Sequence, residues 1–266
     1  LPTTNMQFIG MNTLSEFTCY QSYRYALNFA VDRAYIANNI LNGSAATASI
    51  PICPENSLYN ADLASRYAFD LENCKRLFSD AGVRDYDEDG MLEYQLPGGI
   101  AEIDLDFIVC SDNTDKVKAA QKIAADLESI GIGITVRQLT WVEYVYSITN
   151  GEYDMFYGEI KLPADFNLTD LMTTNGVKNF FGINDPNYYE YIHSFLSAQT
   201  DEERYVACDY MCQYIADGAV IVPICFEKQQ VLTHRDVVSG IEATQYNVFY
   251  NLKNWTINMK VGERED

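Results

Sequence analysis

The chain is predicted to fold as an α/β domain with a mostly parallel sheet and flanking helices, on three observations. In its middle, runs with strand-like alternation are interleaved with stretches of helical periodicity. The order strand, helix, strand, helix, strand at this spacing is a βαβ series, whose right-handed crossovers make the strands parallel. Hydrophobic residues make up 48% of the 266 residues, enough to bury the core of one large domain or two small ones.

The first third of the chain predicts one strand, two helices and a long connection. Met6–Thr13 is apolar enough for a short strand, and the apolar stripe of Ser22–Leu41 predicts a long amphipathic helix. Gly43 suits the left-handed position that ends such a helix. Two prolines mark Ala45–Ala64 as a loop, and Leu71–Ala81 is predicted as the second helix.

The βαβ series occupies the middle of the chain. Alternating or β-branched runs predict strands at Ile103–Val109, Ile132–Leu139 and Tyr153–Tyr157. Between them, apolar residues three and four apart predict helices at Thr114–Ile130 and Trp141–Thr149. Strand and helix segments therefore alternate, as a parallel sheet requires.

The last third predicts two helices followed by strands. Asn187–Ala198 and Asp201–Ala216 have helical periodicity, whereas the short apolar runs Gly218–Phe226 and Gln230–Thr233 predict strands. Signals are weaker beyond these runs, and Val248–Ile257 is predicted as an edge strand.

The net charge of the chain argues against one class of partner. The 38 acidic and 18 basic residues give −20 at pH 7, and such a surface repels nucleic acid and anionic membranes while it attracts cations. The longest apolar run, Gly218–Phe226, has about half the length of a membrane span. The seven cysteines form no CxxC pair, so neither a zinc site nor a disulfide framework is indicated.

The candidate ligand site lies at and just beyond the end of the predicted strand Tyr153–Tyr157. A proline-bearing loop follows that strand, and open α/β sheets bind ligands in loops past the carboxyl ends of their strands. Carboxylates and aromatic side chains concentrate there, and the candidate ligand-binding residues are Tyr157, Glu159, Asp165, Phe166 and Asn167. The alternative is a solvated acidic loop with Phe166 in the core.

An acidic loop between a helix and a strand is the candidate metal site. Asp85, Asp87 and Asp89 stand at the first, third and fifth positions of a calcium loop, and Gly90 stands at the sixth. The usual final glutamate is absent, and Glu93 is a partial substitute for it. Calcium is therefore a candidate ligand of the three aspartates and Glu93, and no other cofactor is indicated. The alternative is a turn held by aspartate side chains.

The chain carries no recognisable catalytic signature. It has no GxSxG elbow, phosphate-binding loop, dinucleotide fingerprint or HExxH sequence. Carboxylates are numerous, however, so a carbohydrate-active enzyme domain with paired carboxylates stays as an alternative class.

Five stretches taken together resemble a known family. They are FIGMNT with YRYALNFAVDRAYIANNILNG, then LENCKRLFSDAGVRDYDEDGMLE, KAAQKIAADLESIGIGITV, GEYDMFYGEIKLPADF and DGAVIVPICF. Their order and spacing over residues 6–233 resemble the C-terminal half of family 5 extracellular solute-binding proteins. Members of that family are the peptide- and nickel-binding subunits of ABC importers.

The resemblance implies a type II periplasmic-binding-protein fold, in which two α/β lobes close on a ligand by a hinge motion. Residues 1–240 would form the C-terminal ligand-binding lobe, and residues 241–266 a return segment toward an N-terminal lobe, with a charged tail. The hinge would lie near Met6–Thr13 and Val231–Gly240. The implied partners are that N-terminal lobe, an ABC transporter permease and a small ligand. The implied location is extracellular or periplasmic, with a lipoprotein anchor.

The resemblance also implies a role for Asp165. In peptide-binding members an aspartate of an ADY stretch pairs with the α-amino group of the ligand, and Asp165 matches it in Ala164-Asp165-Phe166. Glu159 and Asp165 together favour a small peptide or another cationic ligand. We therefore expect capture of oligopeptides without covalent chemistry, and a sensor domain with the same fold is a further alternative. For the acidic loop, the resemblance implies a mainly structural role.

Overall fold

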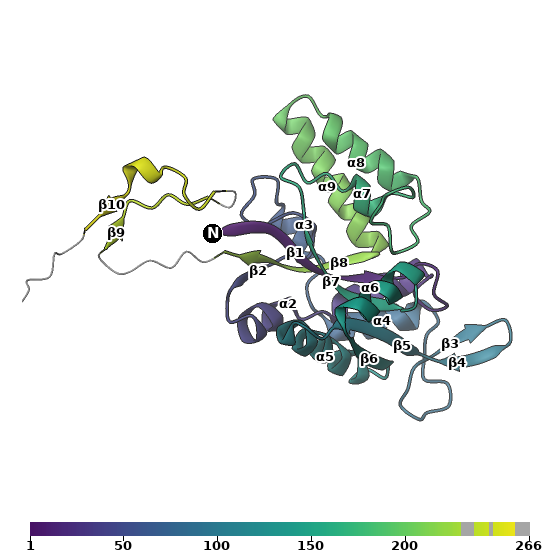
Figure 1. Ribbon diagram of the computed structural model, residues 1–266. Helices are drawn as coiled ribbons and strands as arrows, with labels where there is room; N and C mark the ends of the chain where they lie inside the picture. Colours follow the sequence, from purple (N-terminus) through teal and green to yellow (C-terminus); the bar gives the residue numbers. More distant parts are fainter. Residues whose placement is uncertain (230–236, 245–246, 259–266) are drawn as a thin grey trace, which may run out of the picture.

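Six strands form the central sheet of the molecule (Figure 1). The computed structural model describes residues 1–229, 237–244 and 247–258. The strands lie side by side in the order β2-β8-β1-β7-β5-β6. Their bounds are β1 Pro2–Met11, β2 Ala45–Thr47, β5 Asp104–Cys110, β6 Gly133–Leu139, β7 Met155–Lys161 and β8 Ile221–Lys228.

Four of these six strands run in the same direction, which confirms the predicted mostly parallel sheet. β5 pairs in parallel with both β6 and β7. β8 runs the same way as β7, because β1 is antiparallel to both of them. The short β2 is antiparallel to β8 at the sheet edge. β1 is therefore reversed in the middle of the sheet, an arrangement that hydrophobic periodicity does not encode.

The five longer helices end at most two residues from their predicted bounds. Side-chain caps explain the accuracy at their starts, since Asn113 caps α5 while Thr140 and Thr200 form capping boxes at α6 and α9. The helices are α4 Leu71–Asp80, α5 Thr114–Glu128, α6 Trp141–Asn150, α8 Asn187–Ser197 and α9 Asp201–Gly218. Two shorter ones are α3 Ala61–Ser65 and α7 Thr169–Met172.

The prediction of one continuous helix at Ser22–Leu41 is wrong. The backbone is extended at Val31, with φ −100° and ψ 101°, and the side chain of Asp32 then accepts the N–H of Tyr35 at 2.9 Å to start a new helix. The segment thus consists of α1 Gln21–Leu27, a 3-10 turn at Asn28–Ala30, α2 Arg33–Tyr35 and a π-helical turn at Ile36–Ile40.

The break in this helix buries Arg33 and joins α2 to β8. The Arg33 guanidinium donates to the carbonyl oxygens of Pro223 at 2.7 Å and Tyr67 at 3.1 Å, and to Oδ1 of Asn28 at 2.6 Å. Burial lowers the pKa of Arg33 to about 10, so the group stays charged at neutral pH. A buried charge is tolerated here because carbonyl and amide oxygens surround its donors.

Two hairpins extend from the main body (Figure 1). The first pairs β3 Glu93–Leu96 with β4 Gly99–Glu102. The second pairs β9 Val238–Ser239 with β10 Thr256–Ile257, encloses a 3-10 turn at Leu252–Asn254 and lies apart from the body in Figure 1.

Of the two strands predicted after residue 229, only one lies within the described residues, and it agrees with the structure less closely than the five longer helices do. In the predicted edge strand Val248–Ile257, only Thr256–Ile257 is a strand, because the preceding residues form turns. The predicted strand Gln230–Thr233 lies outside the described residues, as does the first part of the predicted hinge segment Val231–Gly240.

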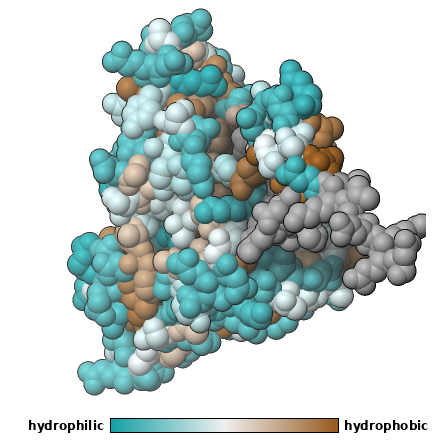
Figure 2. Space-filling model, turned by 90° about the vertical axis from the view of Figure 1, so that its left-hand side faces the viewer, coloured by the Kyte–Doolittle hydropathy of each residue, from teal (hydrophilic) through white to brown (hydrophobic). Residues whose placement is uncertain are grey.

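Hydrophilic side chains cover most of the face shown in Figure 2, with hydrophobic patches between them. This agrees with the acidic composition of the chain. Within the described ranges, none of the helices has both the length and the apolar character needed to cross a bilayer.

Replacement of Arg33 by lysine is expected to lower the free energy of unfolding by about 3 kcal/mol, because an ammonium cannot satisfy three separate acceptors with the planar geometry of a guanidinium. The midpoint of urea unfolding measures this change. Arg66→Lys is the matched control, since Arg66 is exposed and should change stability by less than about 0.5 kcal/mol. Equal midpoints for the two variants would show that the buried contacts of Arg33 contribute nothing.

Candidate functional site

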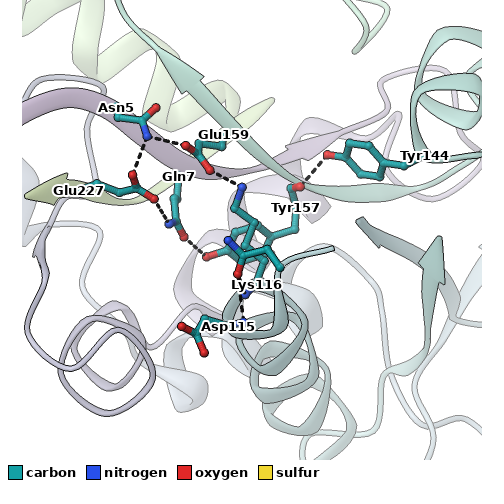
Figure 3. A network of polar contacts seen from close by, with 9 residues as sticks. Asn5, Gln7, Asp115, Lys116, Tyr144, Tyr157, Glu159 and Glu227 are labelled. Carbon is teal, nitrogen blue, oxygen red and sulfur yellow. Dashed lines mark hydrogen bonds and ion pairs between the residues drawn. The ribbon is translucent and has the colours of Figure 1, made fainter. Parts of the chain in front are cut away.

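A network of polar side chains lies where β1, β7 and β8 run side by side (Figure 3). Side chains alternate along a strand, so Asn5 and Gln7 of β1 share one face of the sheet. Gln7 is paired with Glu159 of β7, which places Tyr157 and Glu159 on the same face. Glu227 of β8 completes the network.

Two amide side chains hold this network together, and one of them, Asn5, connects its two carboxylates. Nδ2 of Asn5 donates to Glu159 and, at 2.6 Å, to Oε2 of Glu227. Nε2 of Gln7 donates to the other oxygen of Glu227 at 2.7 Å, and the hydroxyl of Tyr157 donates to Oε1 of Gln7 at 2.6 Å. The three strands are therefore joined by side chains as well as by backbone hydrogen bonds.

Lys116 of α5 forms an ion pair with Glu159 at the edge of the network. Their side chains are 16% and 28% exposed, so solvent screens the pair only in part. Burial would raise the pKa of Glu159, but the hydrogen bonds from Lys116 and Asn5 and the charge of Lys116 outweigh it, and the pKa lies below its ordinary value. Glu159 is thus an ionised carboxylate whose charge is already met inside the protein.

A cavity of about 620 Å³ lies beside β7, between that strand and α6. Aromatic side chains form much of its wall, namely those of Phe8, Trp141, Tyr144, Phe156, Tyr157, Phe180 and Phe181. The hydroxyl of Tyr144 donates to the carbonyl oxygen of Tyr157 at 2.6 Å, which ties α6 to the strand. The volume and the apolar wall are those of a small-molecule site.

A second cavity, of about 390 Å³, adjoins the first. The two share four lining residues, which are Ile160, Lys161, Leu171 and Lys178. Asn167 and Pro163, from the loop after β7, also line the second cavity. The end of β7 and its following loop therefore border both adjoining cavities, together called the hollow region.

The five candidate ligand residues occupy different places around this region. Tyr157 and Glu159 line the first cavity and Asn167 the second. Asp165 is exposed and its Oδ1 accepts the N–H of Asn167 at 3.1 Å, whereas Phe166 is buried in the core with a positive φ of 53°. Asp165 and Phe166 line neither cavity, and the buried Phe166 matches the alternative of a solvated loop anchored in the core.

Sequence reasoning missed several residues of the cavities. Lys116, Lys161 and Lys178 come from three separate segments, and Phe180 and Phe181 lie beyond α7. No local pattern marks them, because only the packing of a helix, a strand and a loop that are far apart in the chain brings them together. The aromatic doublet at 180–181 was the one available signal.

The acidic loop gathers its four carboxylates as predicted, with one oxygen from each within 4.8 Å of the others. Oxygens of Asp85, Asp87 and Asp89 each accept a backbone N–H within the loop, and the buried Glu93 accepts the N–H of Tyr86 at 2.7 Å. These hydrogen bonds are those expected for the alternative given above, a turn held by aspartate side chains. Calcium binding stays a prediction, which titration calorimetry with calcium would test.

A family model described as "Bacterial extracellular solute-binding proteins, family 5 Middle" matches residues 1–177. The chain belongs to this family. The match confirms the resemblance seen in the sequence motifs, and the family consists of solute-binding proteins found outside the cell membrane.

Curated relatives in this family are distant and longer. A probable di/tripeptide-binding protein 5 of Pseudomonas aeruginosa is 24% identical over 243 residues, which cover 89% of this chain and 43% of the relative. Heme-binding protein A of Haemophilus influenzae is 24% identical over 209 residues, covering 75% of this chain and 35% of the relative. The chain spans less than half the length of these relatives.

Solved structures of the family share the fold. The oligopeptide-binding protein AppA from Bacillus subtilis, in complex with a nonapeptide, aligns with a TM-score of 0.76 at 18% identity, over 97% of this chain and 52% of that one. NikZ from Campylobacter jejuni, in complex with Ni(L-His), aligns with a TM-score of 0.73 at 18% identity, over 96% and 52%. The type II periplasmic-binding-protein fold is thereby confirmed.

The Glu159→Gln variant of this family member is expected to lose about 1 kcal/mol of unfolding free energy at neutral pH, because Lys116 loses its ionised partner. The folded-state pKa of Glu159 lies below its ordinary value of 4.5. Its contribution is therefore present above pH 4.5 and disappears as the pH falls through the lower folded-state value.

Urea unfolding of wild type and variant between about pH 7 and about pH 3 measures this difference. Glu102→Gln is the control, because Glu102 is exposed and forms no ion pair in the part of the chain that the structure describes. If wild type were more stable than Glu159→Gln by the same amount at about pH 3 as at about pH 7, the ionised Glu159 would not be the source of the difference.

Proposed function

We propose that this chain is the ligand-binding lobe of an extracellular solute-binding protein that captures short peptides for an ABC importer. The observation that carries the proposal is a free strand edge beside the aromatic cavity. β7 pairs with β1 from Met155 to Lys161 but with β5 only at Met155 and Phe156. Among the described residues, nothing pairs as a strand with the other side of residues 157–161.

The backbone groups on this edge have the orientation that an extended peptide needs. The N–H of Leu162 donates to Thr4 in line with β1, so the even-numbered residues of this stretch face β1. In an antiparallel pair the odd-numbered residues then direct their N–H and C=O groups to the opposite side. Glu159 and Lys161 therefore offer main-chain hydrogen bonds along the cavity, and an extended peptide could add there as a strand.

Two further features support a peptide ligand and a second lobe. Relatives with similar sequence are described as di/tripeptide-binding and oligopeptide-binding proteins. The hairpin of β9 and β10 exposes Phe249, Tyr250 and Ile257, an apolar surface that suits a return segment packing on an N-terminal lobe. On this proposal, ligand closes the two lobes by hinge motion, and a permease and a lipoprotein anchor complete the system.

We propose no covalent chemistry for this site. The two carboxylates of the polar network, Glu159 and Glu227, both accept amide hydrogen bonds, and Glu159 is also paired with Lys116. Such fully engaged carboxylates suit a binding protein better than a catalytic acid pair, which needs one acid with a raised pKa.

Thermal unfolding of the full-length protein should shift upward with pools of short peptides and stay unchanged with sugars, polyamines or divalent metals other than calcium. A ligand at one hundred times its dissociation constant adds about 2.7 kcal/mol of stability, enough for a visible shift. A shift with sugars or with metals other than calcium, and none with peptides, would overturn the peptide assignment within the same fold. No shift with any of them would favour the sensor or the enzyme alternative.

Asp165→Asn should weaken peptide affinity at least about tenfold if this carboxylate pairs with the ligand amine. Asparagine keeps the oxygen that accepts the Asn167 N–H, so the variant removes the charge and leaves the turn. Asp62→Asn, on the exposed start of α3, is the control for net charge. Calorimetric affinity equal to wild type in both variants would remove Asp165 from the site.

A further inference from the structure

The cavity beside β7 is rich in lysine although the chain is strongly acidic. Lys116, Lys161 and Lys178 all line it, against a single carboxylate, Glu159, among the described residues of its wall. In the whole chain acidic residues outnumber basic ones by 38 to 18. The balance of charge is thus reversed at the cavity, where an anion is favoured over a cation.

Two of these three lysines have no internal partner in the described parts of the chain. Lys116 is paired with Glu159, but no carboxylate there forms an ion pair with Lys161 or Lys178. Both also line the adjoining cavity, which Asp170 borders without pairing to either ammonium. Among the described residues of the wall, Lys161 and Lys178 are therefore the lysines left to pair with an anionic ligand.

The backbone holds both lysines in defined places. Lys161 ends β7 opposite Asn5 in the pairing with β1. The N–H of Lys178 donates to the carbonyl oxygen of Asp170 at 2.8 Å. The turn between them is tight, since a Cβ on Gly176 would stand 2.4 Å from that oxygen. The two side chains thus start from hydrogen-bonded backbone, and both line the region that the cavities share.

The surroundings of the lysines define the rest of the ligand. Trp141, Phe180 and Phe181 line the same cavity, so part of its wall is apolar. An ion pair that borders such a wall is stronger than one in open water. The combination fits a ligand with an apolar side chain close to an anionic group.

We propose that Lys161 and Lys178 bind a carboxylate of the ligand, so that the protein selects peptides in which a free carboxylate lies next to an apolar side chain. This inference rests on the proposed function as a peptide-binding lobe. It also replaces the expected preference for cationic ligands at Glu159, because Lys116 already meets the charge of that residue.

The test uses the full-length protein and two random tripeptide pools, one with free C-terminal carboxylates and one with C-terminal amides. Competition calorimetry should show the acid pool binding at least about tenfold tighter to wild type, a preference that weakens as salt screens the ion pairs. In the double variant Lys161→Gln/Lys178→Gln the preference should fall to about twofold or less. A third pool, with C-terminal amides and one aspartate per peptide, distinguishes a C-terminal carboxylate from a side-chain carboxylate. Tight binding of this pool would show that a side-chain carboxylate is sufficient.

Two control variants sharpen the result. Lys75→Gln/Arg66→Gln removes the same charge from exposed positions and should keep the acid preference. Lys161→Arg/Lys178→Arg keeps both charges and should also keep it. Equal binding of both pools to wild type, or a preference that survives in the glutamine variant, overturns the inference while peptide binding stands. Failure of every pool to bind overturns the proposed function itself.

Discussion

The reversal of β1 in the middle of the sheet is the constraint on which the rest of the structure depends. Both edges of this strand are hydrogen-bonded, to β7 on one side and to β8 on the other. Without it, the parallel group of β5, β6 and β7 would have no connection to β8 and β2. Its side chains Asn5 and Gln7 also carry the polar network that fixes Glu159 and Glu227. Fold and site thus share one strand.

Local signals in the sequence were sufficient for most of the body. Capped, periodic segments such as α5 and α9 could be located within two residues, because their hydrogen bonds are internal and their caps lie next to them. The break before Arg33 was missed because a favourable apolar stripe hid it, although Asp32 had the residue type of a cap. Most side chains of the apolar stripe are buried as predicted, but the stripe wrongly predicts one continuous helix.

The candidate site was predictable only in part, for a physical reason. Strand ends and loops are local features, and three of the residues they indicate, Tyr157, Glu159 and Asn167, line the two cavities. Their role in ligand binding stays a prediction. Which charges face each other depends on segments far apart in the chain. Lys116 lies 43 residues from Glu159, and its ion pair meets the charge of that carboxylate inside the protein. Net charge describes the whole surface and gives no account of one cavity.

The central position of β1 also determines when the sheet can be completed during synthesis of the chain. Gln7 and Glu227 lie 220 residues apart, so β1 leaves the ribosome long before β8 exists. Until then one edge of an apolar strand has no partner, and such an edge is prone to pair with other chains. The sheet is finished only when almost the whole body has been synthesised. During synthesis, the long separation of these two strands along the chain therefore makes protection of the β1 edge more important than it would be in a sheet of neighbouring segments.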